Sequence, residues 1–244
     1  MLPFPHSSGA LLLPSLVPQE FCAHWLTLIE HRYATLDAEA LIASGDYSPH
    51  SSSLRLRALP QISVGAVWAE LRRNPEFLAT VHHALGPRIS CAVDECWIRR
   101  QYAPGRYPPL HAAHSWHQDG ALGFDFLASD PRPAPTNAPL EMLTCWLPLM
   151  PCGNDAPGLE LIARRQESLL APVDLTQAQM SLRFAEVERW RPRMGVGDAL
   201  LFCGDLLHRT GITAGMSRDR VSIELRFFPS NGRPVPQQLR PLVD

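Results

Sequence analysis

Three residues in the second half of the chain have the types and spacing of metal ligands. His117 and Asp119 are separated by one residue and followed by Gly120, in the stretch HSWHQDG. If this stretch is extended, side chains two residues apart point to the same side, so an imidazole nitrogen and a carboxylate oxygen meet at one point. His208, far downstream, is the candidate third ligand. Two histidines and one carboxylate form a facial triad, which leaves coordination positions open on iron(II).

Arg220 could supply the cation that such a metal centre needs nearby. An iron(II) site that splits O2 takes electrons from a co-substrate, and 2-oxoglutarate supplies them by decarboxylation. Its far carboxylate suits a planar guanidinium, which binds it through two parallel hydrogen bonds. Arg220 opens a predicted strand beyond His208, and Ser222 on the same face could add a hydroxyl. The sequence leaves Arg218 and Arg226 as alternative anchors.

Each of these residues also has a plain structural interpretation. A His-x-Asp pair alone is a weak motif, because His117 could be an ordinary histidine and Asp119 a turn former. Its combination with His208 and the arginine favours a metal site. His111 and His114 could bind a second metal, but lining the entrance or lying on the surface is the simpler interpretation. Core packing or solvent exposure is expected for most of the remaining candidates: His82, His83, Arg99, Arg100, Gln101, Tyr102, Trp116 and Trp146. Asp125 and Glu141 are possible extra carboxylates without a distinguishing signal.

The composition is that of an ordinary globular protein. The 244 residues have a net charge of -2, which gives no reason to expect nucleic acid or an anionic membrane as a partner. All 22 basic residues are arginines, so a Schiff-base lysine mechanism is excluded. The six cysteines form no Cys-x-x-Cys motif, and no signal peptide or membrane span is evident. We expect a cytoplasmic protein without disulfides; the sequence does not indicate its oligomeric state.

The pattern of elements predicts helices first and strands afterwards. Residues 1–17 are expected to be an irregular arm, and helices are expected from residue 18, over 36–43 and over 64–85, with a polar loop at 46–60. Strands are predicted over 88–102, the central His-x-Asp stretch, 140–149, 159–162, 199–203 and 220–228, with a proline-rich loop at 128–139. Residues 167–190 are ambiguous.

This order predicts a mainly β fold with flanking helices. The expected architecture is a double-stranded β-helix, a jelly-roll of the cupin type, covered by an N-terminal helical layer. We predict a single domain over 1–244, in which residues 1–88 form the arm and helices. Residues 89–228 would form the core, and 229–244 a proline-rich tail.

Three motifs together resemble the phytanoyl-CoA dioxygenase family of Fe(II)/2-oxoglutarate oxygenases. They are WHQDG at 116–120, the segment 153–162, and GDALLFCGDLLHRTG at 197–211, followed by the Arg220 strand. The resemblance covers roughly residues 90–228. It implies that His117, Asp119 and His208 are iron ligands, that Arg220 anchors 2-oxoglutarate, and that the fold is a double-stranded β-helix.

The sequence departs from the family pattern in two places. The family's proline-glycine-serine-histidine run is replaced by IARRQ at 162–166, and its asparagine after the last ligand is absent from GITA at 211–214. Neither change removes a ligand, but both bear on the substrate.

The resulting hypothesis is an Fe(II)- and 2-oxoglutarate-dependent dioxygenase that uses O2 to hydroxylate a small molecule, releasing succinate and CO2. A carboxylate ligand at Asp119 leaves no position for chloride, so halogenation is disfavoured, whereas desaturation, epoxidation and ring formation stay open. Two other classes are a cupin-like metalloenzyme, such as an isomerase or hydrolase, and a catalytically silent ligand-binding jelly-roll.

Overall fold

The computed structural model describes residues 8–121, 139–166, 168–230 and 239–242. Its α-helices are α1 (Gln19–Ala34), α2 (Ala38–Ala43), α3 (Val64–Leu71), α4 (Pro75–Leu85) and α6 (Gln177–Arg183). Short 3-10 helices are η1 (Leu56–Ala58), η2 (Val93–Glu95), η3 (Asp119–Ala121) and η4 (Pro172–Leu175). The strands are β1 (Ala10–Leu13), β2 (Tyr47–Ser48), β3 (Ser53–Arg55), β4 (Ile89–Ala92), β5 (Trp97–Gln101), β6 (Leu143–Pro148), β7 (Gly158–Ile162), β8 (Arg189–Trp190), β9 (Ala199–Cys203), β10 (His208–Gly211), β11 (Arg220–Pro229) and β12 (Leu239–Leu242).

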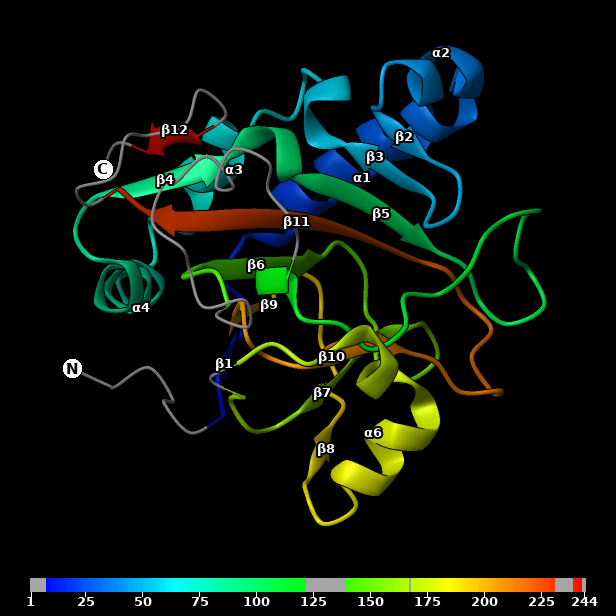
Figure 1. The fold of residues 1–244 in the computed structure, drawn as a ribbon. Coiled ribbons are helices and arrows are strands. Elements are labelled where there is room, and N and C mark those ends of the chain that lie inside the picture. Colours follow the sequence, from blue (N-terminus) through cyan, green and yellow to red (C-terminus); the bar gives the residue numbers. More distant parts are fainter. Residues whose placement is uncertain (1–7, 122–138, 167, 231–238, 243–244) are drawn as a thin grey trace.

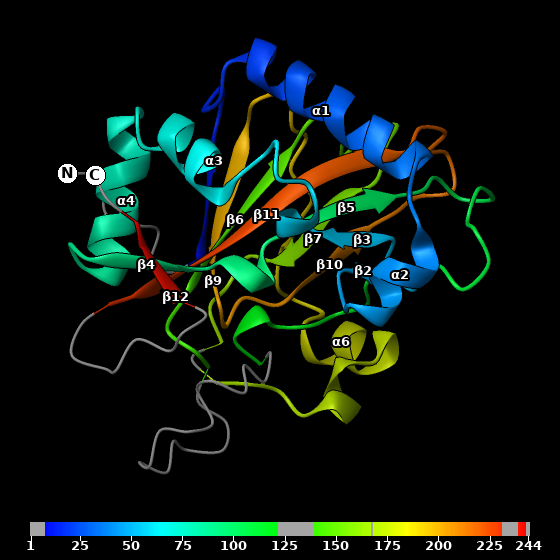
Figure 2. The same cartoon turned by 90° about the horizontal axis from the view of Figure 1, so that it is seen from above.

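The described strands form two antiparallel sheets, as expected for a double-stranded β-helix. The larger sheet has nine strands, with the main order β1-β9-β6-β11-β5-β3-β2, and β4 and β12 continue along the end of β11. The smaller sheet has the order β10-β7-β8. Helices α1, α3 and α4 lie on the outer side of the larger sheet, and the smaller sheet lies on its other side with α6 (Figures 1 and 2). The predicted jelly-roll with an N-terminal helical layer is therefore confirmed.

Strand β11 separates the hydrophobic core from the interior between the sheets. Its odd-numbered residues Val221, Ile223, Leu225 and Phe227 are buried in the main hydrophobic cluster with the helices. Its even-numbered side chains point the other way, because successive residues of a strand alternate between the two faces. The alternating sequence RVSIELRFF thus fixes which side of the sheet is apolar and which is polar.

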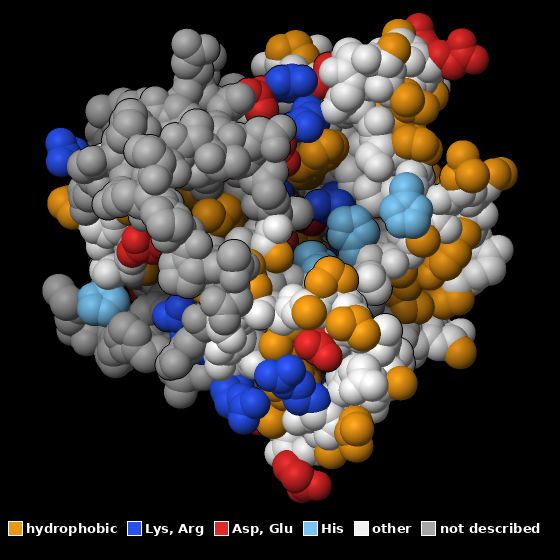
Figure 3. Space-filling view, in the orientation of Figure 1, with side chains coloured by type: hydrophobic (Ala, Val, Ile, Leu, Met, Phe, Trp, Pro, Cys, Tyr) orange, Lys and Arg blue, Asp and Glu red, His pale blue; other side chains and the backbone are white. Residues whose placement is uncertain are grey.

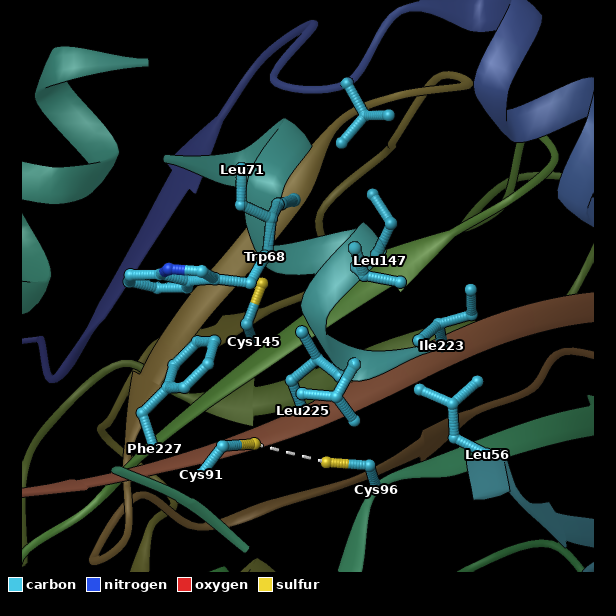
Figure 4. Close-up of a cluster of buried hydrophobic side chains, with 14 of the residues drawn as sticks. Leu56, Trp68, Leu71, Cys91, Cys96, Cys145, Leu147, Ile223, Leu225 and Phe227 are labelled. Carbon is cyan, nitrogen blue, oxygen red and sulfur yellow. Dashed lines mark hydrogen bonds between the residues drawn. The ribbon is translucent and has the colours of Figure 1, made fainter. Parts of the chain in front are cut away.

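The helical layer packs on the apolar face through large side chains. Trp68 of α3 contacts Phe227 with a ring-centroid distance of 5.4 Å, and Phe77 of α4 contacts the same ring at 6.2 Å. Figure 4 shows Trp68, Leu71 and Phe227 gathered above β11 and β6. Burial of such side chains stabilises a fold by about 1.5–3 kcal/mol each, so this layer holds the larger sheet in place.

Several element boundaries predicted from the sequence were wrong. The expected arm includes β1, which pairs with β9, and the expected loop at 46–60 contains β2 and β3. The predicted helix over 64–85 is two helices, because Asn74 caps α4 through its side chain and Pro75 starts that helix. The segments that form β1, β2 and β3 have little periodicity of their own, and pairing with distant strands decides their conformation.

Further differences lie in the β region. The predicted strand over 88–102 is divided into β4 and β5 by η2, and the proline-rich tail contributes β12, which pairs with β4. The ambiguous segment 167–190 contains η4, α6 and β8. Most of the predicted loop at 128–139 lies outside the described residues.

All six cysteines are buried and free, as expected. The Sγ atoms of Cys91 and Cys96 lie 3.4 Å apart as hydrogen-bonded thiols (Figure 4). Among the helices that the structure describes, none is both long and apolar enough to cross a bilayer.

Gly197 provides a test of how the N-terminal segment is attached to the sheet. It has a φ of +86°, and a Cβ there would lie 2.1 Å from the carbonyl oxygen of Val17. Gly197→Ala should therefore lower the free energy of unfolding by about 3 kcal/mol, from backbone strain and the clash together. Gly45, with a φ of +73° and nothing within 4 Å, is the matched control. Gly45→Ala should cost only about 1 kcal/mol. Urea unfolding measures both, and equal losses would contradict the close approach.

Candidate metal centre

The backbone brings the two histidines together. His117 and His208 form an isolated antiparallel bridge in which each main-chain N–H donates to the other residue's carbonyl, at 3.0 and 3.1 Å. The centroids of their imidazole rings lie 4.1 Å apart. Each Nδ1 lies within hydrogen-bond distance of the carbonyl oxygen two residues upstream, Ser115 at 2.7 Å and Leu206 at 3.0 Å. A carbonyl only accepts, so both Nδ1 atoms donate, and in a neutral imidazole this leaves Nε2 as the atom with a lone pair for a metal.

Asp119 reaches the same point by a turn and not by an extended strand. The predicted extended conformation was wrong beyond His117, because η3 begins at Asp119. Gly120 permits this turn: its N–H donates to the Gly204 carbonyl at 2.7 Å, and a Cβ on Gly120 would lie 2.9 Å from that oxygen. The glycine of the motif is therefore needed for close approach of two backbone segments.

Three acceptor atoms converge in this geometry. The Nε2 atoms of His117 and His208 lie 3.6 and 3.8 Å from Asp119 Oδ1. In the described part of the chain, these three residues form a group that could hold a metal ion. One ligand atom from each residue lies within 4.8 Å of the other two. Unprotonated imidazole nitrogens facing a carboxylate oxygen repel it, and a divalent cation between them removes that repulsion. The donor set fits iron(II) or a similar transition metal.

The electrostatics keep these groups in the protonation states that a metal requires. Burial lowers the pKa of His117 to about 4, assisted by the neighbouring His208. Burial alone would raise the pKa of Asp119, but the Arg226 guanidinium and the hydrogen bond from Thr144 hold it below its ordinary value. The first two positions of the triad are therefore a neutral imidazole and a carboxylate at neutral pH, the forms that bind metals.

The two oxygens of Asp119 have different partners. Oδ1 faces the histidines, whereas Oδ2 accepts a hydrogen bond from Thr144 Oγ1 at 2.6 Å and a longer one from Arg226 Nη2 at 3.5 Å. Both partners are buried, at 1% and 2% exposure. This arrangement presents a single oxygen to the metal position. A carboxylate that binds through one oxygen leaves more coordination positions for other ligands.

Arg220 lies on the wall of the same cavity, and Ser222 is fully buried beside it. Arg220 Nη1 donates to Ser222 Oγ at 2.6 Å, Nε donates to the Pro157 carbonyl at 3.2 Å, and the guanidinium lies 4.9 Å from the ring of Trp146. Arg220 is 2% exposed, and burial lowers its pKa to about 10, so it stays charged at neutral pH. Among the described residues, no carboxylate forms an ion pair with it. A buried cation without an anion is costly, so this position favours an anionic ligand.

The two alternative arginines have other partners. Arg218 is half exposed and pairs with Asp155 at 3.4 Å. Arg226 shares the face of Arg220, but it points to Asp119 and Glu224 and donates to the Glu95 carbonyl at 2.6 Å. Of the three arginines, Arg220 is the one that lines the cavity.

The other predicted candidates lie in several parts of the structure. His111 is buried between Tyr102 and Tyr107 and hydrogen-bonded to Ser52 and Gln101, away from the triad. Trp116 is core, as expected, whereas the cavity is lined by Arg99, Gln101, His114 and Trp146. Arg100 pairs with Glu30, Glu141 and His83 are exposed, His82 is half-buried, and Asp125 lies outside the described residues.

Sequence reasoning did not identify Thr144 and Glu224 as part of the site. Thr144 is the one polar side chain in the apolar strand LTCWLP, a signal that could have been used. Glu224 lies two residues from Ser222 on the polar face of β11, so strand alternation could have found it. Figure 3 shows histidine and arginine side chains at a hollow in this face of the molecule. The cavity has an empty volume of about 460 Å³, which includes space open to solvent.

A two-sheet β-helix with this cluster between its sheets is the architecture of the cupin-like non-haem oxygenases. Residues 6–218 match the phytanoyl-CoA dioxygenase (PhyH) family, and the chain belongs to that family. The resemblance inferred from the sequence motifs is thereby confirmed, and it places the chain in the Fe(II)/2-oxoglutarate-dependent superfamily. A search among curated proteins gives no match to this sequence.

Solved structures with the same fold include enzymes of different reactions. EctD from S. alaskensis, with 2-oxoglutarate and 5-hydroxyectoine, has a TM-score of 0.63 at 15% identity, covering 98% of this chain and 82% of that one. The 2-oxoglutarate-dependent epimerase SnoN from nogalamycin biosynthesis has a TM-score of 0.57 at 13% identity, covering 92% and 80%. The carbocyclase SnoK from the same biosynthesis has a TM-score of 0.55 at 13% identity, covering 97% and 93%.

Thr144 provides a test of the carboxylate's orientation. Thr144→Val keeps the side-chain shape but removes the hydroxyl that holds Asp119 Oδ2, so we expect the affinity for Mn(II) to fall about tenfold or more. Thr144→Ser keeps the donor and should bind Mn(II) nearly as well as the parent protein. Titration followed by electron paramagnetic resonance measures both. Equal affinities of the two variants would show that Asp119 needs no support from this hydroxyl.

Proposed function

We propose that this protein is an Fe(II)/2-oxoglutarate-dependent dioxygenase that hydroxylates a small molecule, with release of succinate and CO2. The observation that carries the proposal is the presence, in one cavity, of three convergent metal-ligand atoms and a buried guanidinium without a carboxylate partner. Membership of the PhyH family supports the same reaction class.

In this proposal His117, Asp119 and His208 hold the iron, and Arg220 with Ser222 holds the far carboxylate of 2-oxoglutarate. Ser222 Oγ accepts from Arg220 and is free to donate to a carboxylate oxygen in turn. Trp146 lies against the guanidinium and keeps water from one side of it. The anchor is thus fixed before the co-substrate enters, which reduces the entropy lost on binding.

The iron and 2-oxoglutarate, when bound, supply the oxidising chemistry, and the protein supplies position and seclusion. The triad side chains are fixed by hydrogen bonds to two backbone carbonyls and to the Thr144 hydroxyl, so they do not have to reorganise on loading. Leu159 and Phe202 give the cavity an apolar edge next to His208, where they limit the access of water.

The reaction outcome follows from the placement of the substrate C–H bond. The proteins with this fold include an epimerase and a carbocyclase, so the same centre serves several outcomes. Asp119 occupies the position that halide-using enzymes need open, which disfavours halogenation. Hydroxylation is the simplest outcome for a small substrate in this cavity. We also propose a cytoplasmic location.

Turnover of 2-oxoglutarate in the absence of a primary substrate tests the proposal. The protein with Fe(II), ascorbate and O2 should form succinate slowly, and Asp119→Ala should abolish this activity because the triad loses its only anionic ligand. Chelation of the metal should have the same effect, and Fe(II) should restore the activity. Iron-independent succinate formation, or none at all under any condition, would favour a different metalloenzyme or a silent binding protein.

Arg220 is tested by its effect on the co-substrate. Arg220→Ala should raise the KM for 2-oxoglutarate by about 100-fold or more, because a bidentate contact has two charge-assisted bonds that contribute about 1.5–3 kcal/mol each. Arg218→Ala, which removes an exposed arginine two residues away, should leave the KM unchanged. The comparison is made in the uncoupled succinate assay. An unchanged KM in Arg220→Ala would remove the arginine from the co-substrate site.

A further inference from the structure

The cavity contains a second guanidinium that the proposed reaction does not use. Arg99 of β5 is paired in register with Ser222, so it lies on the polar face between the sheets. Its Nε lies 2.6 Å from Glu224 Oε1, and its Nη1 donates to Ser53 Oγ and His114 Nε2, both at 3.0 Å. Its side chain is 16% exposed, and it lines the cavity with the triad.

The charges around the cavity do not balance. Among the described residues, the cavity walls and their direct ion-pair partners contain four guanidiniums and three carboxylates: Arg99, Arg209, Arg220 and Arg226, with Asp119, Glu160 and Glu224. Arg99 Nη1 donates to His114 Nε2, so this nitrogen carries no proton and the imidazole adds no charge. The other partners of Glu160 are Arg189 and Arg191, which do not line the cavity and have side chains that are 27% and 47% exposed, so they are left out of this count.

Loading the site leaves this excess in place. If the proposed function holds, the two positive charges of the metal and the two negative charges of 2-oxoglutarate cancel. One positive charge then stays without a partner in a largely buried space, which costs free energy unless a ligand supplies the anion. Glu224 cannot supply it, because its two oxygens already face Arg99 and Arg226.

We propose that the primary substrate carries a single carboxylate, which binds against Arg99 on the wall formed with His114 and Ser51. A phosphate ester carries about 1.5–2 negative charges and would overcompensate the excess, so a monocarboxylate is the better match. Ser51 Oγ is within hydrogen-bond distance of Ser53 Oγ and lines the same wall, where it can donate to the substrate. The inference rests on the proposed function but concerns the substrate alone.

The test compares acids with neutral analogues of the same shape. Protein loaded with Mn(II) and 2-oxoglutarate is titrated with benzoate, hexanoate and N-acetylglycine and with the matching primary amides, and binding is followed by saturation-transfer NMR. At least one acid should bind about tenfold or more tightly than its amide, the effect of one charge-assisted hydrogen bond. Equal binding within every acid–amide pair, or no binding of any acid, overturns the proposal.

Two substitutions should move this acid preference in opposite directions. Arg99→Met should abolish it, whereas Glu224→Gln, which increases the positive excess, should enlarge it. If the Arg99–Glu224 ion pair had only a structural role, both variants would bind the acids more weakly. Arg99→Lys should retain part of the preference, and Arg100→Met is the matched control, because Arg100 is the next residue of β5 and pairs with Glu30.

The affinity for 2-oxoglutarate separates this proposal from the proposed function. Arg99→Met should bind 2-oxoglutarate as the parent protein does; a loss as large as that of Arg220→Ala would place Arg99 in the co-substrate site and overturn the inference. Failure of the parent protein to bind 2-oxoglutarate with Mn(II), or to form succinate with Fe(II), would instead contradict the proposed function.

Discussion

The convergence of three acceptor atoms on one point is the constraint on which the rest of the structure depends. Two imidazole nitrogens and a carboxylate oxygen face each other within 4.8 Å, an arrangement that is unfavourable without a cation. The chain maintains it by covalent and hydrogen-bonded geometry: the paired backbones of His117 and His208, and the tight approach of Gly120 to Gly204. The folding free energy that offsets this unfavourable arrangement comes mainly from burial of the apolar face of the larger sheet.

Strand β11 links that stability to the chemistry. One set of alternate side chains is packed beneath the helices, and the other set, two arginines, a serine and a glutamate, faces the interior between the sheets, where Arg220 and Glu224 line the cavity. A shift of one residue would exchange the two sets, so the hydrophobic core fixes the register that places Arg220. The cavity wall can vary without disturbing the core. This separation explains how related folds serve an epimerase and a carbocyclase.

The sequence alone determined the class of fold and the three residues of the candidate metal site. The His-x-Asp-Gly motif, the later histidine after a Gly-Asp-apolar strand, and the alternation of RVSIELRFF are local patterns, and each has a direct physical meaning. The same patterns predicted β6, β7, β9 and β11 close to their observed bounds. They could not predict β1, β2, β3 or β12, because those short strands depend on pairing with distant partners and have no strong periodicity.

Only the tertiary structure decided what each charged residue is for. Three arginines near the last strand are equivalent in sequence, yet one is on the surface, one holds Asp119, and one lines the cavity without a carboxylate partner. Likewise, the contact of Thr144 with Asp119 and the pairing of Glu224 with Arg99 join residues that are far apart in the sequence. The physical reason is that ion pairing and burial act over a few ångströms in space, whatever the separation along the chain.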